Sequence, residues 1–331
     1  MQQGLPISVV IPTFESAAYL PALHNSIING PMAPVVQEII YVVEGNDNSE
    51  KIISEFEKLS TIPLQVIRPK KRLGKFLSRL EGAKLAKCSR VLLLDSRVTL
   101  PERAAKALKH MPEDFRLVLA RLDLDETKNI FCLYWQRTHE KIFYRNFISE
   151  NEIVKMTPET FDKYVTGTTF LYIDRDLFVQ GCENLKDRPM YSDDTFLLKE
   201  LSRKTDIILH PEIAVRWEPR REWWKFLKHL YDRGPGFAEY HIFEHRGWLF
   251  YLVLTGSLCL LAILTLLFVR PELALLALGL CTGVMFLSTA IFVKSFKEFW
   301  RLAPLHTMVL VFYGLGAMNG IRVISLQRCK K

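Results

Sequence analysis

The fold is decided by the stretch Arg90-Val91-Leu92-Leu93-Leu94-Asp95-Ser96-Arg97-Val98. The consecutive large apolar residues Val91–Leu94 predict a strand that is buried on both faces, as in parallel sheets. Asp95 then stands at the carboxyl end of that strand, which is the edge of an open α/β sheet where ligands bind. Two interpretations stay open: Asp95 contacts a ligand, or it caps the helix that Pro101 and Glu102 would begin.

Strands and helices alternate along the chain on the amino-terminal side of this stretch. Short apolar runs predict strands over 7–13, 38–44 and 64–67, and apolar residues at helical spacing predict helices over 19–27, 52–59 and 77–85. Strict alternation of this kind favours a parallel sheet with helices on both faces. We therefore predict an α/β domain.

Composition limits the partners that the chain can have. The 331 residues carry a formal net charge of +8, spread along the sequence. No recognition helix or base-stacking motif accompanies this charge, so we expect no nucleic acid and interpret the excess as attraction to anionic lipid headgroups. The six cysteines lie far apart and no pair has metal-ligand or redox spacing, which indicates reduced cysteines.

The carboxyl-terminal third has the hydropathy of a membrane domain. Apolar runs over 248–269, 271–293 and 302–320 approach the roughly 20 residues that cross a bilayer. We therefore predict three parts: a globular domain over 1–215, an amphipathic interfacial segment over 216–246 and a transmembrane domain over 247–331.

Charge near the apolar runs predicts the orientation. Residues 1–5 do not resemble a signal peptide, and basic residues flank the first two runs on the side of the large domain. We therefore expect an integral membrane protein with a cytoplasmic globular domain. The third run either crosses the membrane or lies in its interface, because the basic tail after it favours the inside. Its small residues Gly316 and Gly320 predict packing against another helix.

Several short motifs occur in a characteristic order. Ile11–Phe14, Val42–Glu44, Arg79 with Gly82-Ala83, and Leu93–Asp95 together resemble the nucleotide-sugar half of an inverting family 2 glycosyltransferase of GT-A fold. The resemblance implies a nucleotide-sugar donor. It also implies that Pro12, Thr13 and Glu44 hold the nucleoside, with Glu44 in place of the more usual Asp, and that Arg79 and Asp95 belong to the donor site.

Asp193 and Asp194 precede an apolar helical run and resemble the acidic pair of that family, whose second member is the catalytic base. The resemblance assigns this role to Asp194, with Asp193 as its neighbour. An inverting transfer needs a carboxylate that takes the proton of the acceptor hydroxyl during the attack. The alternative is that both acids only stabilise the helix dipole.

The chain departs from the family at the positions expected to bind a divalent cation. Arg97 ends the central motif where an acid is common, and Arg216 stands where a His is common. We favour metal-independent action in which both arginines neutralise the donor diphosphate. Two alternatives stay open: Mg²⁺ or Mn²⁺ still binds through Asp95 with His210 or Asp193, or the site has lost turnover.

Two other Asp-x-Asp strings lie in connections where the family varies. These are Asp123-Leu124-Asp125 and Asp174-Arg175-Asp176. We predict that they are solvated acids in turns and not a metal motif.

The segment from Arg216 to Tyr240 mixes tryptophans with basic residues, as helices in the membrane interface do. Within it, Arg233-Gly234-Pro235-Gly236 resembles a loop near the donor diphosphate in membrane-bound family members, which would give Arg233 a phosphate contact. A simple junction between a helix and a span explains the glycines as well.

These observations predict a membrane-anchored glycosyltransferase. It would move one sugar from a nucleotide-sugar donor to a hydroxyl of a lipid-linked glycan or lipid at the cytoplasmic face, because the anchor confines enzyme and acceptor to one surface. The alternatives are a polyprenyl-phosphate glycosyltransferase and a non-catalytic membrane protein that binds nucleotide sugars. The pattern indicates no oligomeric state.

Overall fold

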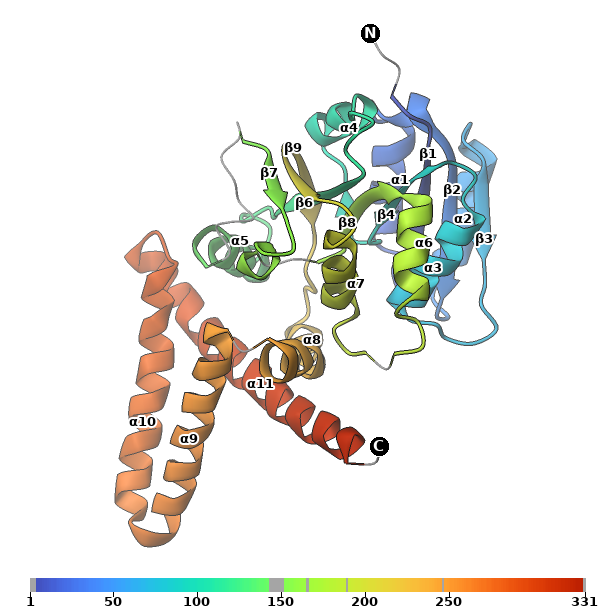
Figure 1. The fold of residues 1–331 in the computed structure, drawn as a ribbon. Coiled ribbons are helices and arrows are strands. Elements are labelled where there is room, and N and C mark those ends of the chain that lie inside the picture. Colours follow the sequence, from blue (N-terminus) through green and yellow to red (C-terminus); the bar gives the residue numbers. More distant parts are fainter. Residues whose placement is uncertain (1–3, 143–151, 165–166, 189, 246, 330–331) are drawn as a thin grey trace. The chain divides into compact units, whose positions relative to one another are not determined.

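The computed structural model describes residues 4–142, 152–164, 167–188, 190–245 and 247–329 (Figure 1). It divides into two compact units. The sheet unit comprises Met1–Asp125, Phe143–Pro189 and Asp194–Glu218, and the helical unit comprises Glu126–Ile142, Met190–Asp193 and Pro219–Lys331. The segments 126–142 and 190–193 thus belong to the helical unit although they lie within the predicted domain 1–215.

The sheet unit is built on a sheet whose strands follow the order β3-β2-β1-β4-β8-β6-β9-β5 in the described residues, with β7 also paired to β9. The strands are β1 Ile7–Phe14, β2 Val36–Glu44, β3 Leu64–Ile67, β4 Arg90–Leu94, β5 Val98–Thr99, β6 Leu117–Asp123, β7 Val154–Met156, β8 Phe170–Asp174 and β9 Ile207–Trp217. The predicted α/β class is confirmed, and the stretch 91–94 forms the buried strand β4.

The expected parallel pairing holds only for the first half of the sheet. Strands β1, β2, β3 and β4 pair in parallel. Strand β8 runs antiparallel between β4 and β6, and β9 is antiparallel to β5 and β7. The sheet is therefore mixed. The parallel pairing was predicted from the alternation of elements up to β4 and is confirmed for those strands. It does not extend to β8, because α5 and β7 separate β6 from β8 and no single crossover helix forces parallel pairing there.

Helices of the sheet unit follow the strands as predicted. They are α1 Leu20–Ile28, α2 Ser49–Leu59, α3 Lys75–Leu85, α4 Glu102–Lys109, α6 Arg175–Glu183 and α7 Asp193–Ser202, with short 3₁₀ turns η1 Ala33–Val35 and η3 Phe161–Lys163. Helix α3 lies close against the sheet because Gly82 has no side chain. A Cβ at Gly82 would overlap Val10 and lie 3.2 Å from Val42.

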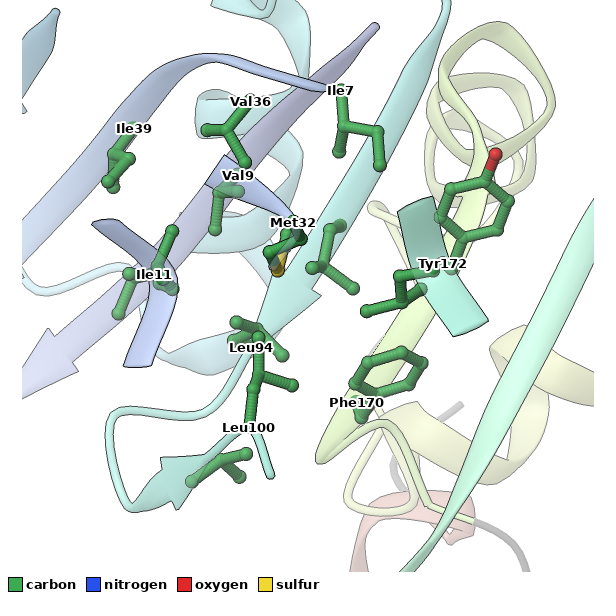
Figure 2. Close-up of a cluster of buried hydrophobic side chains, with 14 of the residues drawn as sticks. Ile7, Val9, Ile11, Met32, Val36, Ile39, Leu94, Leu100, Phe170 and Tyr172 are labelled. Atoms are coloured by element: carbon green, nitrogen blue, oxygen red, sulfur yellow. The ribbon is translucent and has the colours of Figure 1, made fainter. Parts of the chain in front are cut away.

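The main core lies against β1, β2, β4 and β8. Figure 2 shows side chains from these strands pointing toward one another, among them Ile7, Ile11, Leu94 and Phe170. Each is at most 1 % exposed. Full burial of a side chain of this size is worth about 1.5–3 kcal/mol, so the core holds the carboxyl ends of these strands in fixed positions.

A buried histidine makes the stability of this core depend on pH. His24 stacks on Phe56 with ring centroids 4.0 Å apart, and its Nδ1 lies 2.9 Å from the hydroxyl of Tyr41. Burial lowers the pKa of His24 to about 4. The unfolded chain binds the proton at the ordinary pKa of about 6.5, so the stability due to neutral His24 is full above that pH and is lost as the pH falls toward 4.

We therefore expect the melting temperature to fall more steeply between pH 6.5 and 4 in the native chain than in a His24→Gln variant. Differential scanning fluorimetry of both proteins in the same detergent measures the two slopes. Equal slopes would show that His24 does not resist protonation in the fold.

The helical unit contains α5 Ile130–Lys141, α8 Trp223–Ala238, the π-helical η4 Glu239–Glu244, α9 Trp248–Val269, α10 Pro271–Leu287, the 3₁₀ turn η5 Ser288–Ile291 and α11 Phe296–Arg328. Helices α9 and α10 lie side by side (Figure 1). Three segments are long and apolar enough to cross a membrane: Leu249–Val269, Pro271–Ile291 and Phe296–Arg328. The third extends well beyond the predicted 302–320. Lys330 and Lys331 of the basic tail lie outside the described residues.

The Arg233–Gly236 stretch lies inside helix α8, so the loop predicted here is wrong. Its glycines allow close helix packing instead. A Cβ at Gly234 would overlap the backbone of Gly316, and a Cβ at Gly320 would lie 2.6 Å from the Cα of Pro235. The prediction that the small residues of α11 pack against another helix is thus confirmed, and the partner is α8.

Candidate active site

Loops after three parallel strands meet at one edge of the sheet. The hydroxyls of Ser16, after β1, and Ser96, after β4, lie 2.6 Å apart. Asp47, after β2, accepts hydrogen bonds from the backbone N–H of Ala17 at 2.9 Å and of Ser49 at 3.2 Å. Asp95 follows β4 directly, so this edge carries residues that were predicted to bind the nucleotide-sugar donor.

Arg79 on α3 is the central side chain of the site. It is only 2 % exposed. Its guanidinium donates to Asp95 at 2.9 Å and to Asp194 at 3.3 Å, and also to the side chain and the carbonyl oxygen of Thr168. Both Nη groups are paired, while the buried Nε has no hydrogen-bond partner among the described residues. Through these Nη groups Arg79 holds three separate segments of the chain around itself.

Lys75 supplies a second cation to the same two acids. It lies one turn before Arg79 on α3, and its Nζ is 3.2 Å from Asp95 and 3.5 Å from Asp194. Lys75, Arg79, Asp95 and Asp194 form what we call the ionic cluster. The sequence analysis missed Lys75 and Thr168. The i,i+4 spacing of Lys75 and Arg79, which puts both on one face of a helix, was an available signal.

The structure excludes one of the two alternatives that concerned helix ends, and the other stays open. Pro101 is the N-cap of α4, and the backbone N–H of Asp95 donates to Thr169 at 2.9 Å, so the interpretation of Asp95 as a cap is wrong. Asp193 and Asp194 open α7, where the helix dipole favours acids. Asp194 also contacts both cations of the ionic cluster, which a dipole alone does not require.

The predicted nucleoside residues lie at the ends of β1 and β2. Glu44 is buried and accepts hydrogen bonds from the backbone N–H of Gly74 at 3.2 Å and from the hydroxyl of Ser78. It therefore also holds the start of α3, where Gly74 has φ of 79°. Pro12 and Thr13 lie within β1 beside β2. The role of these residues toward a donor stays a prediction.

Arg97 and Arg216 come together through the pairing of β5 with β9. Arg97 precedes β5, and its carbonyl accepts from the backbone N–H of Glu218 at 3.1 Å, while Arg216 lies opposite Thr99. The guanidinium of Arg97 lies 4.7 Å from the ring centre of Tyr19. Its Nη1 is buried and has no hydrogen-bond partner among the described residues, so this donor is available to an anion.

The acid that was predicted to bind a divalent cation, Asp95, is paired with two cationic side chains. Such ions take several oxygen ligands, and usually more than one carboxylate. In the described part of the chain no group of three or more His, Cys, Asp or Glu side chains is placed to hold a metal. The carboxylate of Asp95 is paired with Arg79 and Lys75, and Nδ1 of His210, on β9, accepts a hydrogen bond from the backbone N–H of Glu212 at 3.2 Å. Metal-independent action stays a prediction.

Arg233 belongs to the helical unit, where its side chain is exposed on α8. Within that unit, burial together with the nearby charge of Arg233 lowers the pKa of His139 to about 4. The predicted phosphate contact of Arg233 stays a prediction.

The two Asp-x-Asp strings have structural roles. Asp174 caps α6 by accepting from the backbone N–H of Leu177 at 3.1 Å, and it pairs with the buried Arg90 at 3.0 Å. Asp123 ends β6 and pairs with Arg121 at 3.2 Å. They are not simply solvated turn acids as predicted, because both take part in ion pairs.

Comparison with known proteins identifies the sheet unit. Residues 8–170 match the family model described as glycosyl transferase family 2. These residues are a family 2 glycosyltransferase domain. They include β1 to β4 and the ionic-cluster residues Lys75, Arg79 and Asp95, and this domain makes the chain a glycosyltransferase. A search of curated protein sequences finds no match.

Solved glycosyltransferase structures share the GT-A fold. The mannosyltransferase PcManGT from Pyrobaculum calidifontis, in complex with GDP-Man and Mn²⁺, has a TM-score of 0.60 at 14 % identity, covering 95 % of this chain and 87 % of that one. S. aureus TarS 1-349 has a TM-score of 0.50 at 13 % identity, covering 98 % and 92 %. GalNAc-T7 with UDP, GalNAc and Mn²⁺ has a TM-score of 0.51 at 16 % identity, covering 78 % and 52 %. These likenesses confirm the predicted fold.

Proposed function

We propose that this glycosyltransferase moves one sugar, with inversion, from a nucleotide-sugar donor to a hydroxyl of a lipid-linked glycan or lipid at the cytoplasmic face of a membrane. The observation that carries the proposal is the ionic cluster, in which Asp194 at the start of α7 shares two cations with Asp95 at the end of β4. PcManGT in complex with GDP-Man and TarS in complex with UDP-GlcNAc support a nucleotide-sugar donor.

Asp194 is the proposed general base. Its carboxylate takes the proton of the acceptor hydroxyl while the hydroxyl oxygen attacks the anomeric carbon. The bond from that carbon to the diphosphate oxygen breaks on the opposite face, and its electron pair leaves with the nucleoside diphosphate. Lys75 and Arg79 hold the carboxylate in one place throughout, so little reorganisation accompanies the reaction.

Fixed cations are proposed to neutralise the leaving diphosphate. The free Nη1 donor of Arg97, the exposed guanidinium of Arg216 and the ammonium of Lys75 are suited to phosphate oxygens. In this proposal Asp95 orients Lys75 and Arg79, Glu44 with Pro12 and Thr13 holds the nucleoside, and no divalent cation takes part.

A polyprenyl-phosphate acceptor is the alternative. A phosphate oxygen is already ionised and needs no base. The placement of Asp194 between two cations favours the hydroxyl acceptor, because a carboxylate without a catalytic task would add charge to the site for no purpose. Membrane helices serve both acceptors equally, since each would be a lipid.

The proposal is tested by offering the purified full-length protein in nanodiscs a panel of nucleotide sugars with a membrane lipid extract. A radiolabelled sugar that passes into the lipid fraction supports the proposal, and mild alkaline or acid treatment separates a glycosidic product from a glycosyl phosphate. Nucleotide sugars that are bound and never consumed would overturn it.

Removal of divalent cations is expected to leave transfer unchanged within about twofold, because the fixed charges of Arg97 and Arg216 need no ion. Rates are compared in EDTA, in EDTA with excess Mn²⁺, and in EDTA with excess Mg²⁺. Activity that EDTA abolishes and either ion restores would contradict metal-independent action and make Asp95 a metal ligand.

A further inference from the structure

Helix α11 is long and apolar enough to cross a membrane, yet one of its faces is covered by two polar helices of the same unit. In its first half, His306 Nδ1 lies 2.9 Å from the hydroxyl of Tyr134 on α5. In its second half, Gly316 and Gly320 approach the backbone of α8 so closely that neither site has room for a Cβ. Helix α11 therefore follows α5 and then α8 along its length.

Both ends of α11 contact segments of the helical unit that lie close in sequence to the sheet unit. Near the start, Glu298 forms an ion pair with Arg137 of α5 at 2.8 Å. Near the end, Gln327 donates to the hydroxyl of Tyr191 at 3.0 Å. Helix α5 begins soon after β6, and Tyr191 lies just before α7. A helix that crosses a bilayer has its ends on opposite sides of about 30 Å of hydrocarbon, which these tethers oppose.

The backbone at Tyr191 is held in place by η4. The backbone N–H groups of Tyr191 and Ser192 donate to Glu239 of η4 at 2.8 and 2.9 Å, and Glu239 is buried. The tether at the end of α11 therefore involves ordered backbone and not only one flexible side chain.

The charges on α8 add an energetic argument. Helix α8 exposes Lys225, Lys228, Asp232 and Arg233. If α11 crossed the membrane, α8 would enter the hydrocarbon with it because the two backbones touch at Gly234 and Gly316. Charged side chains are strongly unfavourable in the hydrocarbon of a bilayer, so these four residues oppose a spanning position of α11.

The outer face of α11 has the character of a surface-bound helix. It carries an exposed stripe, which we call the outer stripe, of Phe296, Trp300, Pro304, Met308, Val311 and Leu315. Spacing of three to four residues places all of them on one side of the helix. Helices α9 and α10 are different, because only 6 % and 11 % of their apolar windows are buried, against 28 % for α11.

We propose that α9 and α10 are the membrane-spanning helices and that α11 lies in the plane of the membrane, with the outer stripe against the boundary of headgroups and acyl chains. The partner of this surface is a lipid bilayer, into which the adjoining α9–α10 hairpin inserts. The carboxyl terminus then stays on the same side of the membrane as the sheet unit, as the basic residues Arg322 and Arg328 favour.

Labelling of single cysteines tests the topology in the full-length protein. Cys259, Cys281 and Cys329 are not buried, so Cys329 is labelled in a Cys259→Ser, Cys281→Ser background. Lys51→Cys and Glu272→Cys, in a background that also carries Cys329→Ser, mark the sheet unit and the α9–α10 turn. We expect a membrane-impermeant maleimide to label Cys329 and Lys51→Cys in the same vesicle orientation, and Glu272→Cys in the opposite one. Labelling of Cys329 together with Glu272→Cys would overturn the proposal.

Depth measurements test the outer stripe separately. Nitroxide labels are placed at Trp300→Cys, Met308→Cys and Leu315→Cys in a background with Cys259, Cys281 and Cys329 replaced by serine. Lipid-soluble and water-soluble paramagnetic relaxation agents report the depth of each label. An in-plane helix gives similar, shallow depths at all three positions. A spanning helix would separate the first and last by about 22 Å along the membrane normal. That separation, or labels that contact no lipid at all, would overturn the proposal.

Discussion

Replacing Asp194 with asparagine is expected to lower the turnover number for sugar transfer by about 10²–10⁴-fold, the usual contribution of a general base. Asparagine keeps the size of the side chain, and its one oxygen can still accept a hydrogen bond from Arg79 or from Lys75, so the fold should persist. Donor KM should change much less, because the base acts on the acceptor. Initial rates at varied donor and acceptor concentrations give both quantities.

Asp95→Asn is the matched comparison, because it removes a carboxylate from the same two cations. If both variants act only through the charge balance of the ionic cluster, their kinetic effects will be alike. A specific base role predicts that the loss in turnover is confined to Asp194→Asn, with Asp95→Asn acting mainly on donor KM. Full activity of Asp194→Asn would contradict the base role and favour the polyprenyl-phosphate acceptor.

The sequence predicted those parts of the fold that local pattern and the order of motifs determine. Val91–Leu94 had to be a buried strand because four apolar residues have no polar face to expose, and they form β4. The antiparallel position of β8 could not be predicted in this way. It depends on where the chain goes between β6 and β8, and that path includes α5, which packs in the other unit.

The candidate site likewise contains residues that local pattern indicates and residues that only the folded chain brings together. Asp95 and Asp194 were found because each stands at a marked position, one after a strand and one before a helix. Lys75 has no such mark in the sequence, and its partner Asp194 is 119 residues away. The glycines at 234 and 236 were misassigned to a loop because glycine serves turns and close helix packing equally well. The packing partners distinguish the two uses: Gly234 lies against α11, and Gly236 lies against the backbone of Tyr191 and Ser192.

Removing the guanidinium of Arg79 is expected to have the largest effect on stability. Arg79→Met leaves Asp95 and Asp194 with Lys75 as their only remaining cation among the contacts described above, and it removes a partner of the buried Thr168. Breaking a buried ion pair in this way costs about 3 kcal/mol. For a unit of this size the melting temperature should fall by roughly 6–12 °C. Differential scanning fluorimetry in detergent measures the shift.

Arg90→Met is the control, because Arg90 is also buried and pairs with Asp174 at 3.0 Å, away from the ionic cluster. We expect Arg90→Met to lower the melting temperature while the turnover of its folded fraction stays near normal.

Arg79→Lys distinguishes a positioning role of Arg79 from direct binding of the nucleotide-sugar donor, since lysine restores the positive charge and cannot reach all three partners. If Arg79 positions Asp194, Arg79→Lys lowers turnover more than it raises donor KM. A rise in donor KM alone would instead make Arg79 a direct ligand of the donor, as the family resemblance implies.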